Sequence, residues 1–156
     1  MVIASLAAAP CHAKQKPTRA KVPDLRIVDV TMFPVPFSPA LGSLQLSIVV
    51  ELPAELDGAT VLEVSSLISS PSKRSMRFLA DRQSLEVPSP LAHPQSVERK
   101  PRVLVTLTWD GTDQARRRVE SGRYKYEVRA KLLAVGEEGP RTQMVSWPRR
   151  GTVEVK

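Results

Sequence analysis

Apolar and polar residues alternate along short segments of the chain, which turns rich in proline, glycine and serine separate. The clearest segment covers residues 44–52, where every second position is apolar: Leu44, Leu46, Ile48, Val50 and Leu52. Successive side chains of a strand point to opposite faces of a sheet. This period of two therefore predicts a β-strand with one buried face.

Strand signals of the same kind recur through the rest of the chain. Alternation and β-branched residues predict strands over residues 25–32, 60–68, 76–79, 103–109, 123–133, 143–147 and 152–155. Residues 33–39 hold three prolines, which excludes a helix or a central strand and predicts an edge or a connection. Residues 83–102, with four prolines, predict a long loop.

This order of elements predicts the fold class. Seven to eight short strands without a convincing amphipathic helix favour an all-β, antiparallel β-sandwich. The chain has 156 residues, enough for one domain with a core and too few for two ordinary ones. We therefore expect a single sandwich over residues 24–156.

The first residues differ in composition from this domain. Residues 1–13 are an apolar run followed by small residues, which is typical of a signal peptide with Cys11 and Ala13 at the −3 and −1 positions of cleavage. Residues 14–23 are basic with two prolines and predict a flexible linker. These features predict a secreted, periplasmic or cell-surface protein. An ordinary cytosolic N-terminus, or a lipoprotein acylated at Cys11, are the alternatives.

The composition limits the chemistry of the chain. One cysteine excludes a disulfide scaffold, and two histidines exclude a His-rich metal site. No stretch of about 18 apolar residues occurs, so no membrane span is expected. His93 stands alone in a proline-rich loop, and neither a nucleophile elbow nor a phosphate-binding glycine loop is present. We expect no catalysis and no cofactor.

Three motifs stand out against this background. They are Pro36-Phe37-Ser38-Pro39, the segment 76–80, and Trp109-Asp110-Gly111-Thr112-Asp113 followed by residues 119–126. Trp109 ends the apolar face of one strand and Tyr126 lies on the apolar face of another, so we expect both inside the sandwich. Asp-Gly and Ser-Gly pairs predict turns. Asp110 and Asp113 are expected to tie their loop by accepting backbone hydrogen bonds, with a calcium site as the alternative.

Together these motifs resemble the Ig-like domain of the flagellar hook-capping protein. The residues that carry the resemblance are Pro36, Phe37, Ser38, Pro39, Trp109, Asp110, Gly111, Asp113, Gly122, Tyr124 and Tyr126. The resemblance covers about residues 24–156. It implies an Ig-like sandwich without catalytic activity, which packs against, caps or anchors another envelope or secreted protein.

The formal net charge of +7 raises the question of an anionic partner. Arg116, Arg117 and Arg118 form the densest basic cluster, and Lys73-Arg74 and Arg99-Lys100 are the next. The cluster is either a solvated hairpin tip or a contact for a partner or an anionic surface polymer. No aromatic residues are interleaved with it, so nucleic acid is not expected. We expect Trp147 to cover the core or an edge; as an exposed contact it would instead suit a glycan.

Overall fold

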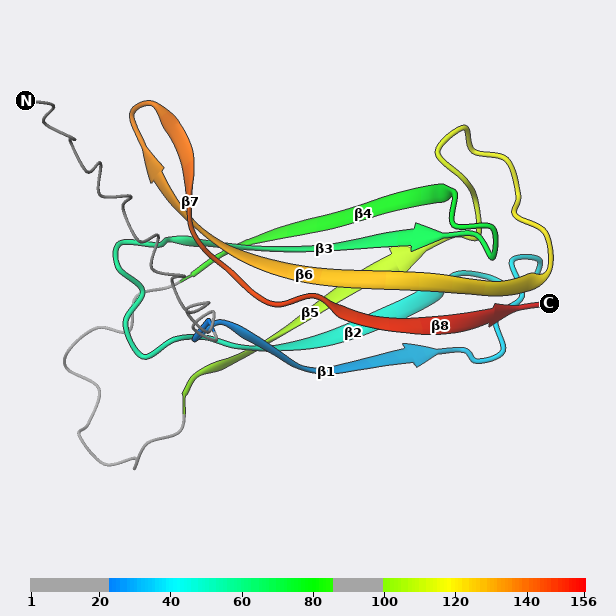
Figure 1. Ribbon diagram of the computed structural model, residues 1–156, viewed down its shortest axis with the longest axis horizontal. Coiled ribbons are helices and arrows are strands. Elements are labelled where there is room, and N and C mark those ends of the chain that lie inside the picture. Colours follow the sequence, from blue (N-terminus) through cyan, green and yellow to red (C-terminus); the bar gives the residue numbers. More distant parts are fainter. Residues whose placement is uncertain (1–22, 86–99) are drawn as a thin grey trace, which may run out of the picture.

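The computed structural model describes residues 23–85 and 100–156 and contains eight strands (Figure 1). The strands are β1 (Arg26–Phe33), β2 (Leu44–Glu51), β3 (Val61–Ser69), β4 (Ser75–Ser84), β5 (Arg102–Trp109), β6 (Gly122–Gly136), β7 (Gly139–Val145) and β8 (Arg149–Val155). Within these ranges no helix is long and apolar enough to cross a membrane. The predicted signal segment with Cys11, nearly all of the predicted linker, and His93 lie outside the described residues.

The strands form two antiparallel sheets that pack face to face. One sheet has the order β1-β2-β5; the other runs β4-β3-β6, and both β7 and β8 pair with β6. β7 pairs with the last third of β6, and β8 pairs with its first half. The predicted all-β sandwich of seven to eight strands is confirmed, and its architecture is consistent with an Ig-like fold.

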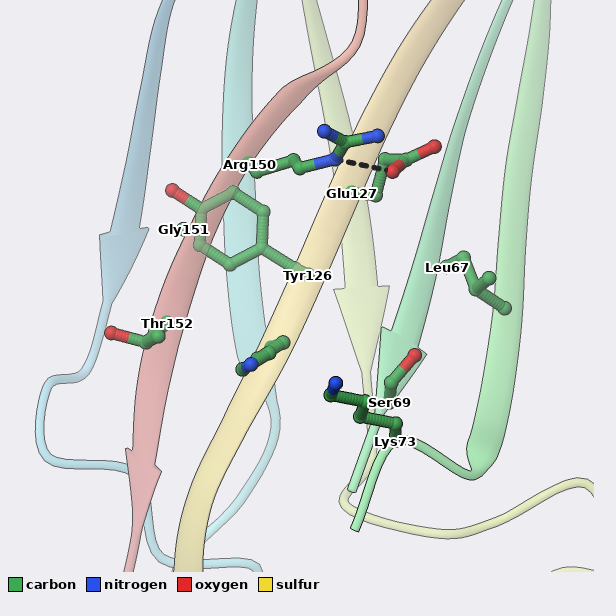
Figure 2. Close-up of a pocket in the computed structure, with 9 residues that line it drawn as sticks. Leu67, Ser69, Lys73, Tyr126, Glu127, Arg150, Gly151 and Thr152 are labelled. Carbon is green, nitrogen blue, oxygen red and sulfur yellow. Dashed lines mark hydrogen bonds and ion pairs between the residues drawn. The ribbon is translucent and has the colours of Figure 1, made fainter. Parts of the chain in front are cut away.

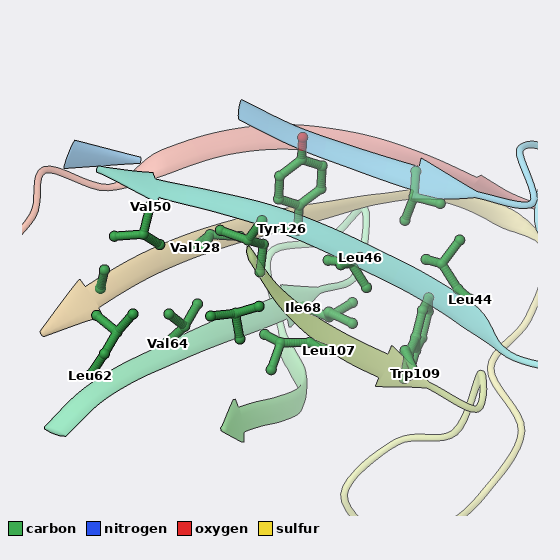
Figure 3. Close-up of a cluster of buried hydrophobic side chains, with 14 of the residues drawn as sticks. Leu44, Leu46, Val50, Leu62, Val64, Ile68, Leu107, Trp109, Tyr126 and Val128 are labelled. Carbon is green, nitrogen blue, oxygen red and sulfur yellow. The ribbon is translucent and has the colours of Figure 1, made fainter. Parts of the chain in front are cut away.

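The core lies between the two sheets and comes from the alternating positions (Figure 3). On β2 the predicted apolar face is buried throughout, and on β5 the inward positions end at Trp109, which is fully buried. β6 contributes its own alternate residues from Tyr124 onward. Burial of this face fixes the register of the strands that carry it, because a shift of one residue would turn it to solvent.

β3 departs from simple alternation because it lies between β4 and β6. Its inward residues are buried as expected, but Glu63 and Ser65 on its outer face are also largely covered. Glu63 is held by two cations from the neighbouring strands: its carboxylate lies 2.6 Å from Arg82 Nε and 3.5 Å from Lys131 Nζ. A carboxylate enclosed in this way needs such partners.

Several predicted bounds are wrong. β4 spans ten residues, not the four of 76–79, and includes Gln83 and Ser84, which were assigned to the loop 83–102. β4 is an edge strand that pairs along the whole of β3, so it tolerates the polar run that hid it in the sequence. β7 begins at Gly139 rather than Gln143, as part of a hairpin with the end of β6.

The proline-rich segment after β1 joins the two sheets. The peptide bonds Phe33–Pro34 and Val35–Pro36 are cis. Beyond them, Phe37 pairs in parallel with the end of β8: its N–H donates to the Glu154 carbonyl (2.8 Å), and its own carbonyl accepts from Lys156 N–H (2.8 Å). The segment is a connection, as predicted, and it places the Phe37 ring in the core.

Candidate binding surface

Two of the sequence motifs meet at one end of the sandwich. The Phe37 ring lies 5.5 Å from Trp109, and Trp109 lies 5.7 Å from Tyr124, measured between ring centroids. The Tyr124 hydroxyl donates to the Glu120 carbonyl at 2.9 Å. A tyrosine at the start of a strand that bonds back to the preceding loop is the tyrosine corner of Ig-like sandwiches. The predicted interior positions of Trp109 and Tyr126 are confirmed.

The loop 110–121 begins as a tight turn fixed by its own aspartates. Asp110 Oδ1 accepts from Thr112 N–H (3.0 Å) and from the Thr112 hydroxyl (2.7 Å). Asp113 Oδ1 accepts from Arg117 N–H at 2.8 Å, and its Oδ2 lies 3.3 Å from Arg117 Nε. These bonds lower the pKa of both carboxyls: the Thr112 hydroxyl contributes most at Asp110, and the Arg117 N–H at Asp113. Both aspartates therefore act as turn caps.

The same loop is attached to the edge strand β4. Arg77 Nη1 donates to the Asp113 carbonyl at 3.1 Å, and Phe78 N–H donates to Gln114 Oε1 at 3.4 Å. Within the loop, the Val119 N–H donates to the Gly111 carbonyl at 2.9 Å. The arginines 116–118 are therefore carried by a hydrogen-bonded loop tied to the sheet, and their side chains are exposed.

The topology brings this loop to the same end as the β3–β4 hairpin (Figure 1). Lys73 and Arg74 of that hairpin, which the sequence separates from Arg116 by some forty residues, thus share one end with it. We call this region the basic end, and its cations are Lys73, Arg74, Arg77, Arg116, Arg117, Arg118, Arg123, Lys125 and Lys156. Its carboxylates are fewer: Asp110, Asp113, Glu120 and Glu154.

A groove of about 700 Å³ leads from the basic end onto the outer face of the larger sheet (Figure 2). Lys73 and Lys125 line it beside the Ser69 and Thr152 hydroxyls. Among the described residues, neither lysine has a carboxylate within ion-pair distance. Farther along, Glu127 binds Arg150 (2.6 Å) and Arg129 (2.7 Å), and the hydrogen bond from Arg150, followed by that from Arg129, lowers the pKa of Glu127.

The prediction that Trp147 covers the core or an edge is wrong. Trp147 is 57% exposed and lies in the link between β7 and β8. The chain there contains an extra residue relative to β6, which turns the indole outward. The inward position is taken by Ser146, whose Oγ accepts from Ala130 N–H at 2.9 Å.

No family model matches this chain, and no curated protein matches it at the significance required. In the part of the chain that the structure describes, no three His, Cys, Asp or Glu side chains gather as a metal site would require. The features that stand out are the basic end, the groove beside it, and the exposed Trp147.

The sequence identified part of this surface. Arg116, Arg117, Arg118 and the pair Lys73-Arg74 were noted there as basic clusters, but Lys125 of the groove was not. Lys125 lies on the charged face of an alternating strand, which indicates exposure and nothing more. Its proximity to Lys73 follows from the pairing of Ser69 with Lys125, a contact across the sheet that no local pattern contains.

Proposed function

We propose that this chain is a non-catalytic, Ig-like binding module that engages an acidic partner protein through its basic end, in a secreted or envelope setting. The observation that carries the proposal is the gathering of two separate basic segments, Lys73-Arg74 and Arg116 to Arg118, at one end of the sandwich. Loops at the ends of a rigid scaffold are where binding surfaces of such folds usually lie.

The loop's construction supports this role. Only Arg117 among the three loop arginines forms an ion pair within the described residues, through its Nε, and its side chain still stays 78% exposed. Arginine offers planar, bidentate donors to carboxylates. Because folding already fixes the loop, its exposed guanidiniums lose less conformational entropy when they bind a partner.

An acidic partner is also consistent with the resemblance to the Ig-like domain of the hook-capping protein. That resemblance implies a structural or protein-binding role without catalysis. Asp110, Asp113 and Glu127, whose pKa values are lowered, hold turns and strands together through their hydrogen bonds.

The second candidate is a module that binds an anionic surface polymer. The groove favours it, because Lys73 belongs both to the basic end and to the groove, and Lys125 extends the cationic path along the sheet. A flexible polyanion could follow such a path over several charges. Its binding would depend steeply on salt, since exposed charges are screened within about 8 Å at 0.15 M ionic strength.

The test uses the full chain as bait for envelope proteins at about 0.15 M and about 1 M salt. The variant Arg116→Gln/Arg117→Gln/Arg118→Gln is compared with Lys100→Gln/Arg102→Gln/Arg141→Gln, which removes the same charge at the opposite end. We expect one acidic protein to be retained by the wild type and the control, and lost from the basic-end variant.

Two results would contradict the proposal. Equal retention of that protein by both variants would show that the basic end is not the contact. Retention at low salt only, shared among many anionic species and lost from the basic-end variant, would replace the acidic-protein assignment by the polymer.

A further inference from the structure

A crevice of about 440 Å³ opens between the start of β1 and the link from β7 to β8, away from the basic end. It is lined by Pro23, Leu25, Arg26, Ile27, Trp147, Pro148 and Arg149. This volume is within the range of about 300–1,000 Å³ that small-molecule sites occupy. The exposed Trp147 thus lies at a concave site that Arg26 and Arg149 also line.

The backbone places Trp147 there by a β-bulge. Between the pairs Lys131↔Val145 and Val128↔Arg149, three residues of the link oppose only Arg129 and Ala130 of β6. Ser146 closes this irregularity: its N–H donates to the Ala130 carbonyl at 2.8 Å, while its Oγ accepts from the Ala130 N–H at 2.9 Å. Bulges commonly re-aim a side chain at a functional site.

Proline follows at position 148 and has no N–H to offer to the sheet. Trp147 and Arg149, on either side of this proline, both line the crevice. The indole stays 57% exposed although a tryptophan ring is the largest apolar group available for burial. Its Nε1–H has no acceptor among the described residues.

The charges around the crevice are mainly positive. Arg26 and Arg149 are exposed and have no ion pair among the described residues. Asp24 lies 3.4 Å from Lys100 Nζ, and Asp29 forms no ion pair with either arginine. Glu51, which lies opposite Arg26 on β2, binds Arg102 at 3.1 Å. The site therefore combines an aromatic face with two guanidiniums that can bind a carboxylate.

We propose that this crevice binds an acidic sugar, with a pyranose ring stacked on Trp147 and its carboxylate bound by Arg26 and Arg149. The C–H groups on one face of a pyranose are apolar and carry slight positive charge, which suits the electron-rich face of an indole. An acidic peptide would use the guanidiniums but has no comparable flat apolar face. This site is separate from the basic end and from the function proposed for it.

The test measures binding of the full chain to tetragalacturonate by calorimetry, with maltotetraose and tetraglutamate as matched probes. We expect tetragalacturonate to bind in preference to both. Trp147→Ala should weaken it about tenfold or more, and Arg26→Gln and Arg149→Gln should each weaken it severalfold. Phe78→Ala, which removes an aromatic ring of similar exposure on β4, should leave binding unchanged.

Three results would overturn the proposal. Absence of tetragalacturonate binding to the folded wild type at about 10 mM excludes a useful affinity. Equal binding of tetraglutamate, unaffected by Trp147→Ala, would show attraction by charge alone. Binding that survives Trp147→Ala but is lost from the Arg116/Arg117/Arg118 variant would place the sugar at the basic end. Thermal melts of each variant verify that it is folded.

Discussion

Gly111 lies so close to Pro39 that a Cβ at position 111 would stand 2.6 Å from the Pro39 side chain and 3.1 Å from the Phe37 ring. Gly111 also has a positive φ of 73°. The turn after β5 is therefore pressed against the proline-rich connection between β1 and β2, two strands of the same sheet. The Pro-Phe-Ser-Pro and Trp-Asp-Gly motifs are two halves of one packing unit.

Gly111→Ala is expected to lower the free energy of unfolding by about 3 kcal/mol. About 1–3 kcal/mol comes from forcing an alanine into positive φ, and overpacking against Pro39 adds a similar amount. Urea denaturation measures the loss. Gly58→Ala is the matched control, because Gly58 has φ 78° but no atom within 4 Å of a Cβ, and it should cost about 1 kcal/mol. Equal losses would show that the contact with Pro39 is unimportant.

Tyr124→Phe is expected to destabilise the protein by about 1 kcal/mol, because the Tyr124 hydroxyl donates to the Glu120 carbonyl at 2.9 Å. Tyr126→Phe serves as the control: the Tyr126 hydroxyl has no partner among the described residues, so its removal should change stability little. Both substitutions keep the buried ring, and urea denaturation compares them. If both variants lost the same free energy of unfolding, the hydrogen bond from Tyr124 to Glu120 would contribute nothing to stability.

Calcium is expected to leave the thermal midpoint unchanged. Asp110 Oδ1 and both carboxylate oxygens of Asp113 already accept hydrogen bonds from Thr112 and Arg117 without an ion. Extracellular calcium sites saturate below about 10 mM, and a site filled a hundredfold above its Kd would stabilise by about 2.7 kcal/mol. Melts with about 10 mM calcium and with chelator compare the two states. A rise of several degrees in the thermal midpoint with calcium would instead support the calcium site that the sequence allowed as the alternative.

The sequence predicted the elements whose burial is one-sided. β2 and β5 each bury one face, so hydrophobic alternation marks them directly, and their predicted inward residues are the core of the structure. β4 was underestimated because it lies at an edge, where polar residues such as Arg82 and Gln83 are tolerated within a strand. The alternation of apolar and polar residues reports the burial of one strand face, and an edge strand buries little of its surface.

The residues of the candidate sites come together through strand pairing, which the alternation of apolar and polar residues along the chain does not reveal. Lys73 and Lys125 become neighbours through the pairing of β3 with β6. Trp147 is turned outward by a single extra residue opposite Ala130, and a one-residue change of register reverses which face a side chain takes. The same tryptophan beside Pro148 is compatible with either a buried or an exposed position until the register is known.

Stability is expected to fall on acidification as Glu127 takes up a proton. Arg150 and Arg129 lower the pKa of Glu127 below its ordinary value of 4.5, so the folded state holds this proton less tightly than the unfolded state. The resulting stabilisation is complete above the unfolded pKa and is lost as the pH falls through the lower, folded pKa. Urea denaturation from neutral pH to below 4.5 measures it. Glu127→Gln and Arg150→Gln should each reduce this acid-dependent loss, because each removes one half of the same ion pair. An acid dependence identical in the wild type and both variants would mean that the pair on the outer sheet face does not contribute to stability.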